Sequence, residues 1–191
     1  AAMCGMTDYW KQMSIECIPL TASELFSFEP SLATWFQRVS NATAWYVPDE
    51  SQLRPPRYLR ALAAACAKSG VRFIETTEVT DIRCVNGHAQ AQYQGVWHES
   101  EHFVLTTGAW TGRVASSLEL ELSIVPIRGQ ILLLKTAVPL VTSVINMGNR
   151  YVLAREDGHT LVGSNEEEKS FELGTTDSVL ESLYQFATHL L

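Results

Sequence analysis

Residues 103–112 hold the residue types in this chain that most directly suggest ligand binding. They read Phe-Val-Leu-Thr-Thr-Gly-Ala-Trp-Thr-Gly, an apolar run that ends in hydroxyl-bearing and small residues. Gly108 lets the backbone approach a ligand closely, and the hydroxyls of Thr106 and Thr107 can hydrogen-bond it. The pattern predicts a buried strand that delivers a small-residue turn to a ligand. A tight turn without a ligand is the alternative.

Other common catalytic and binding motifs are missing from the sequence. There is no GxSxG elbow, no HExxH helix and no phosphate loop. None of the 11 glycines forms a GxG pair, so the Gly-rich turn that holds a pyrophosphate is absent. The four cysteines form no CxxC, and residues 166–168, all Glu, are more simply a charged loop than a metal or paired-carboxylate site. We therefore predict no metal site and assign no catalytic side chain.

Composition narrows the class of protein. The 191 residues are 46% hydrophobic and carry a net charge of -7, with a pI near 5.2. These values are typical of a globular protein and argue against nucleic-acid binding, while the arginines at 54, 57 and 60 fit a solvated helix face. No apolar run approaches the roughly 20 residues of a membrane span. Cys66 lies among alanines, where we expect a reduced core thiol and hence a cytoplasmic protein.

The first half of the chain predicts two helices and several strands. Thr21-Ala-Ser-Glu24 matches a capping box that opens a short helix, and residues 35–47 suggest extended structure. Pro55-Pro56 opens a second helix, which ends at Gly70. Its apolar positions fall on one face at the helical period. The predicted strands are 71–75, 78–82, 89–93 and 96–105.

The second half predicts mostly strands and a final helix. Residues 131–134 form a continuous apolar strand, and strands at 151–154 and 160–163 flank Asp157-Gly158, a strong hairpin signal. Thr175-Thr176 is expected to cap the last helix. One side of that helix carries Leu180, Leu183, Tyr184, Ala187 and Leu190.

Taken together, these segments resemble the middle of an FAD-dependent amine or amino-acid oxidase of the D-amino-acid oxidase superfamily, most closely its glycine oxidase-like members. Four motifs carry the resemblance. They are Glu-Thr-Thr-Glu-Val at 75–79, Thr-Thr-Gly-Ala-Trp at 106–110, Pro-Ile-Arg-Gly-Gln at 126–130, and Tyr-Val-Leu-Ala-Arg at 151–155 with the hairpin that follows.

The resemblance implies roles for individual residues. The backbone of Val79 would meet the adenine of FAD, although it could be an ordinary core valine. Tyr151 would hold the substrate carboxylate through its hydroxyl, although it could be an aromatic on a half-buried strand. Arg128 would contact the cofactor or organise the domain junction, although it could form a structural salt bridge. Ala154 stands where the family has proline, and Asn165 where it has threonine. Further contacts with FAD would come from Thr106, Thr107, Gly108 and Trp110.

The resemblance also implies the fold and its division into domains. We expect an α+β fold, in which a mixed, largely antiparallel sheet has helices packed on one face. Residues 1–54 and 116–191 would form the substrate-binding domain. Residues 55–115 would be an inserted α/β piece of the FAD-binding domain, whose GxGxxG portion and C-terminal portion lie outside this chain.

The implied reaction is oxidation of glycine, sarcosine or a D-amino acid to an imine, with release of hydrogen peroxide. The ends of the chain lack a signal peptide and a helix cap, which suggests a piece of a longer polypeptide. We expect the isolated piece to be inactive, to bind FAD without high affinity and to self-associate. Two alternatives remain open. One is an FAD-dependent dehydrogenase of the same superfamily acting on glycerol phosphate or a 2-hydroxy acid, and the other is a non-catalytic, β-rich binding module.

Overall fold

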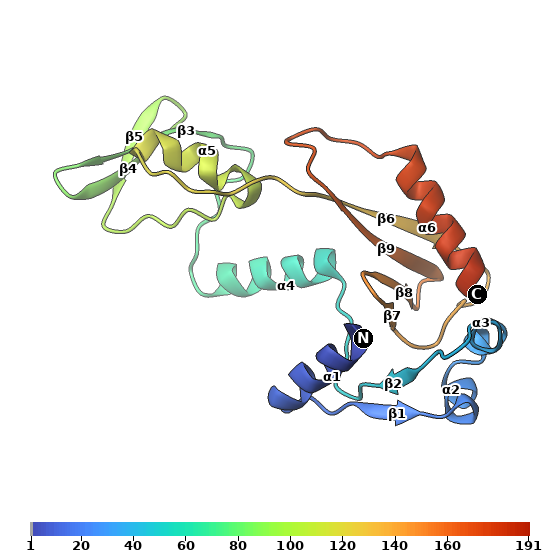
Figure 1. Cartoon of the computed structure of the whole chain (residues 1–191). Coiled ribbons are helices and arrows are strands. Elements are labelled where there is room, and N and C mark those ends of the chain that lie inside the picture. Colours follow the sequence, from blue (N-terminus) through green and yellow to red (C-terminus); the bar gives the residue numbers. More distant parts are fainter. Residues whose placement is uncertain (1) are drawn as a thin grey trace. The chain divides into compact units, whose positions relative to one another are not determined.

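The computed structural model describes residues 2–191, with side chains described from Thr7 onward (Figure 1). Its contacts divide the chain into two compact units. The first unit combines Ala1–Leu53, Gly129–Glu166 and Leu173–Leu191, and the second combines Arg54–Arg128 and Glu167–Glu172. The sequence prediction divides the chain after residues 54 and 115, whereas residues 116–128 fall in the second unit. That one unit serves the substrate and the other the cofactor remains a prediction.

Among the described residues, the first unit contains five helical segments and strands in two sheets. These elements are α1 (Ala2–Gln12), β1 (Ile18–Leu20), α2 (Ala22–Phe28), η1 (Pro30–Leu32), α3 (Ala33–Arg38), β2 (Ala44–Tyr46), β6 (Arg128–Lys135), β7 (Ile145–Met147), β8 (Arg150–Ala154), β9 (His159–Glu167), α6 (Asp177–Leu190) and the loops between them. β1 pairs with β2, and the larger sheet has the strand order β6-β9-β8-β7. The pairs β7–β8 and β8–β9 are antiparallel.

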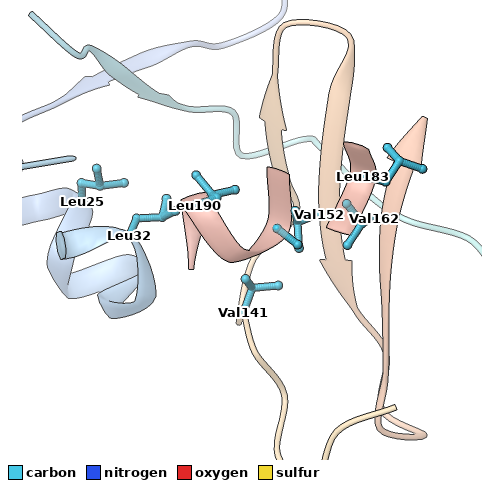
Figure 2. Packing of buried hydrophobic residues seen from close by; sticks show 8 residues of the cluster. Leu25, Leu32, Val141, Val152, Val162, Leu183 and Leu190 are labelled. Atoms are coloured by element: carbon cyan, nitrogen blue, oxygen red, sulfur yellow. The ribbon is translucent and has the colours of Figure 1, made fainter. Parts of the chain in front are cut away.

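Helix α6 packs against one face of the four-stranded sheet and closes the main hydrophobic core (Figure 2). Val152 of β8 and Val162 of β9 face each other in register and are fully buried. Burial of each large aliphatic side chain there stabilises the folded state by about 1.5–3 kcal/mol, relative to leaving that side chain exposed. The predicted α+β class, with an antiparallel sheet and helices on one face, is confirmed. The same core includes Leu25, Leu32, Val141, Leu183, Ala187 and Leu190.

The predicted hairpin at Asp157-Gly158 joins β8 to β9. Gly158 has a φ of +81°, which favours glycine, and its N–H donates to the carbonyl of Arg155 at 3.0 Å. A Cβ at this position would come within 3.2 Å of the Thr136 carbonyl. The turn holds the register in which Tyr151 lies opposite Gly163.

The beginning of the chain confirms one helix prediction and corrects another. Thr21 Oγ1 accepts from the N–H of Glu24 at 3.3 Å, and Glu24 Oε2 accepts from the N–H of Thr21 at 2.8 Å, forming the predicted capping box. The Thr21 backbone and hydroxyl donors lower the pKa of the Glu24 carboxyl. The extended structure predicted from residue 35 is wrong for Trp35 and Phe36, which lie in α3 and pack on the core. Burial of these rings outweighs their preference for strands.

The second unit contains one long helix and a three-stranded antiparallel meander, β3-β4-β5. Its small core includes Ile82, Ala91 and Ala115. The strands predicted at 78–82 and 89–93 are confirmed. The elements of this unit are α4 (Pro55–Lys68), β3 (Val79–Val85), β4 (His88–Tyr93), β5 (Val96–Ser100), η2 (Gly108–Trp110), α5 (Thr111–Ala115) and η3 (Ser116–Leu118).

Two apolar runs of the second unit are not strands. The structure assigns no strand to residues 71–75 or 101–107, so both predictions are wrong at these positions. The apolar side chains of these runs are also exposed, by 49% at Phe73 and 76% at Val104. A strand requires a neighbouring backbone to pair with, and neither run finds one among the described residues. The expected buried strand ahead of Gly108 is therefore an exposed, unpaired segment.

Helix α4 forms as predicted but buries no residue. Leu59 is 63% exposed and Leu62 is 42% exposed. Cys66 is a free, exposed thiol, so its expected place in a core is wrong. Helices α4 and α6 have 14 residues each, and no described helix is both long and apolar enough to cross a membrane.

We predict that Leu183→Ala lowers the free energy of unfolding by about 2–5 kcal/mol, because it opens a cavity between α6 and the sheet. Urea unfolding followed by circular dichroism measures the change. Leu173→Ala is the matched control. Leu173 is 93% exposed, so its truncation should change stability by less than about 0.5 kcal/mol. Equal losses in the two variants would contradict the assignment of this core.

Candidate functional site

The four-stranded sheet has one face packed against α6 and an opposite face with different residues. Side chains alternate along a strand, so Val152 points into the core and Tyr151 to the opposite face. On β6, Leu132 and Leu134 join the core, while Ile131 and Leu133 alternate with them and are 46% and 55% exposed. This opposite face, which we call the Tyr151 face, is therefore apolar and partly open to solvent.

Tyr151 lies at the middle of the Tyr151 face. Its strand neighbours in register are Gly163 on β9 and Asn146 on β7. The tyrosine is half-buried, and its ring lies over Gly163, where a Cβ would overlap the ring. Among the residues that the structure describes, none hydrogen-bonds the Tyr151 hydroxyl. The hydroxyl is thus available to a ligand.

Two polar contacts near Tyr151 were not found from the sequence. Asn146 Nδ2 donates to Glu50 Oε1 at 2.8 Å, and Gln52 Nε2 donates to the carbonyl of Ala154 at 3.2 Å. Both contacts tie the segment after β2 to the hairpin that carries Tyr151. The only local signal was an Asn inside an apolar run at 144–147, followed by a Gly-Asn turn. The Glu50–Asn146 pair also places a carboxylate and an amide beside the strand next to Tyr151.

A cavity of about 380 Å³ lies in the first unit, between the segment from α2 to β2 and strand β7. Its walls are largely apolar and include Trp45 and the stacked rings of Phe28 and Tyr46, whose centroids are 4.9 Å apart. Asn146 and Glu50 supply polar groups at its wall. The volume falls within the range of small-molecule sites.

Glu29, which the sequence did not reveal, stabilises one wall of this cavity through hydrogen bonds. It is only 3% exposed and accepts from the N–H of Thr142 at 2.7 Å, the N–H of Ser143 at 2.9 Å and the hydroxyl of Ser31 at 2.8 Å. A buried carboxylate is tolerated where donors surround it. Glu29 therefore fixes the segment that leads into β7.

The motif at residues 126–130 contributes an ion pair to this part of the chain. Arg128 Nη2 donates to Glu167 Oε2 at 3.0 Å, with both side chains largely buried, so the salt-bridge alternative is confirmed. The charged loop predicted at residues 166–168 is only partly a loop, because β9 extends to Glu167. The described residues include no group of three or more potential metal ligands.

The last residue of this motif, Gln130, supports the start of α6. It is buried, and its Oε1 accepts from the N–H of Thr176 at 2.6 Å. Thr176 occupies the N-cap position as predicted, but its side chain makes no capping hydrogen bond. Gln130 instead accepts a hydrogen bond from the Thr176 N–H at this end of the helix. The Asn165 side chain accepts from the N–H of Gln130 at 3.2 Å. Asn165, which stands where the family has threonine, therefore links β6 to β9 through this hydrogen bond.

The predicted FAD contacts all lie in the second unit and are accessible. Val79 begins β3 and is 47% exposed. Gly108 has a φ of +54° and open space where a Cβ would stand. Trp110 is 51% exposed and packs against Phe171 at a ring-centroid distance of 5.3 Å. Thr106 and Thr107 are also exposed, and the Thr107 hydroxyl contacts the Thr111 hydroxyl at 3.0 Å.

Comparison with known proteins gives the same family across the whole chain. A family model described as FAD dependent oxidoreductase (DAO) matches residues 6–191. Glycine oxidase of Pseudomonas aeruginosa is 33% identical over 173 residues, covering 88% of this chain and 45% of the relative. Glycine oxidase of Geobacillus kaustophilus is 28% identical over 184 residues, covering 96% and 48%.

A solved structure extends this agreement to the fold. The crystal structure of glycine oxidase from Geobacillus kaustophilus matches with a TM-score of 0.85 at 27% identity, covering 96% of this chain and 49% of that one. The chain thus spans about half the length of the curated relatives it matches. The match includes both the sheet that carries Tyr151 and the segments with the predicted FAD contacts. This chain belongs to the FAD-dependent oxidoreductase (DAO) family and is similar to glycine oxidases over nearly all of its length.

Proposed function

We propose that this chain supplies the substrate wall and part of the cofactor site of an FAD-dependent oxidase. The substrate is a small amine or amino acid, such as glycine, sarcosine or a D-amino acid. In the reaction the amine loses two hydrogens to give an imine, and dioxygen takes them up as hydrogen peroxide. The observation that carries the proposal is the free Tyr151 hydroxyl on the open face of the sheet, in a chain similar to glycine oxidases.

Tyr151 would bind the substrate carboxylate. A phenol hydroxyl donates to a carboxylate, and a hydrogen bond to a charged acceptor is stronger than one between neutral groups. This contact orients the substrate rather than transferring protons. Orientation is what such an oxidation needs most from the protein, because the substrate Cα–H has to face the electron acceptor.

Several residues of the second unit fit an edge of the FAD site. When bound, FAD supplies the acceptor for the hydride that leaves the substrate. The open space at Gly108 and the exposed hydroxyls of Thr106 and Thr107 suit a close backbone approach and hydrogen bonding, and the backbone of Val79 and the Trp110 ring would complete this edge. No Gly-rich turn in this chain suits the pyrophosphate. The residues fit a partial FAD site.

We predict that Tyr151→Phe, in the complete flavoprotein that contains this chain, raises KM for the amino-acid substrate by about ten-fold, because a hydrogen bond to a charged group is lost. The maximal rate should change less, since the ring still packs over Gly163. A coupled peroxide assay with glycine, sarcosine and a D-amino acid measures both constants.

Tyr184→Phe is the matched control for this prediction. Tyr184 lies on α6, is 49% exposed and should leave both constants unchanged. An unchanged KM in Tyr151→Phe would remove the proposed role of the hydroxyl. Reduction of a dye without oxygen consumption would favour the dehydrogenase alternative over an oxidase.

We also predict how the isolated 191-residue chain behaves. It should show no flavin absorbance after gel filtration with added FAD, because it lacks a pyrophosphate turn. It should elute above the 21.3 kDa expected for a monomer, because α4 and residues 71–74 expose apolar side chains. A yellow protein would contradict the first expectation, and a monomer by light scattering at high concentration would contradict the second.

A further inference from the structure

Gly163 lies under the ring of Tyr151. The two residues are direct neighbours on β9 and β8, so their side-chain positions share the Tyr151 face. A Cβ built on Gly163 would overlap Cζ of the tyrosine and lie 2.5 Å from its Oη and 2.7 Å from its Cε1. The phenol end of the ring, rather than its base, therefore covers Gly163. The hydroxyl lies across the sheet, over β9, instead of pointing away from it.

A side chain at position 163 would have no space, because the Tyr151 ring already lies there. The φ of Gly163 is not in the left-handed region, unlike that of Gly158. A glycine in the interior of a strand weakens the strand and often marks close approach by another group. Gly129, on β6 of the same sheet, is different, because a Cβ there meets only the Asn165 carbonyl, at 3.7 Å. Gly163 therefore occupies a position that the tyrosine ring needs, whereas Gly129 does not.

We propose that Gly163 is a positioning residue for substrate recognition. It leaves space beside β9 for the phenol end of the Tyr151 ring and so sets the position at which the hydroxyl can meet a carboxylate. A methyl group at residue 163 forces the ring to rise, and the hydroxyl moves with it. This inference rests on the proposed function for its consequence in catalysis, whereas the ring geometry stands independently of it.

The geometry is tested first, without reference to activity. Protein labelled with [2-13C]glycine should give a Gly163 methylene proton displaced upfield by the Tyr151 ring current in a 1H–13C spectrum. Tyr151→Leu should abolish this displacement, and Tyr151→Phe should keep it. A Gly163 signal that is the same in the Tyr151→Leu variant would overturn the proposal, and this test requires no substitution at Gly163.

The consequence for recognition is tested in the complete flavoprotein. Gly163→Ala should raise KM for a carboxylate substrate by about ten-fold, as loss of the Tyr151 hydrogen bond does. KM for an amine without a carboxylate, such as ethylamine, and kcat for the carboxylate substrate should change by less than about two-fold. Gly129→Ala adds the same methyl group to the same sheet and is the control for a general effect on stability. Its unfolding temperature should equal that of the unsubstituted flavoprotein.

The combined outcomes separate this inference from the proposed function. If Tyr151→Phe raises KM and Gly163→Ala does not, Gly163 has no positioning role although the function stands. If neither variant changes KM while the methylene proton is shifted, the carboxylate contact at Tyr151 is wrong and the role of Gly163 in recognition falls with it. In Tyr151→Leu, where the ring is absent, adding Gly163→Ala should raise KM no further. A further rise would show that the methyl group acts independently of the tyrosine.

Discussion

The packing of α6 on one face of the antiparallel sheet is the contact on which the rest of the first unit depends. Val152 and Val162 are fully buried there, and Leu183 and Leu190 meet them from the helix. Because side chains alternate along a strand, burying this face commits the neighbouring residues to the other one. A slip of one residue would send Tyr151 into the core. Hydrophobic packing on one side of the sheet thus determines which residues can form a site on the other.

Several polar contacts then fix details that packing alone leaves open. Gln130 holds the start of α6, and the Arg128–Glu167 ion pair joins the ends of β6 and β9. The Glu50–Asn146 bond ties the strand next to Tyr151 to a segment 96 residues earlier in sequence. In the second unit much of the apolar surface is exposed.

Local signals predicted much of the fold. The capping box at Thr21, the Asp157-Gly158 turn and the helical periods of α4 and α6 are all found where the sequence indicates. The runs at 71–75 and 103–107 were misread because strand formation depends on a partner, which an apolar run does not reveal. Trp35 shows the opposite error, because extended structure was predicted there and the residue lies in helix α3, where its ring packs against the core. The sequence pointed to Tyr151 through a motif, whereas its neighbours Gly163 and Asn146 depend on strand register, which composition does not disclose.

We propose that this chain forms half of a flavoenzyme that oxidises small amines at the Tyr151 face. Anaerobic titration of the complete flavoprotein with glycine, sarcosine and a D-amino acid, followed by visible flavin absorbance, tests it most directly. We expect that at least one of these substrates bleaches the flavin and that air restores the colour with release of hydrogen peroxide. A complete protein that carries no flavin, or a flavin that none of these amines reduces, would contradict it.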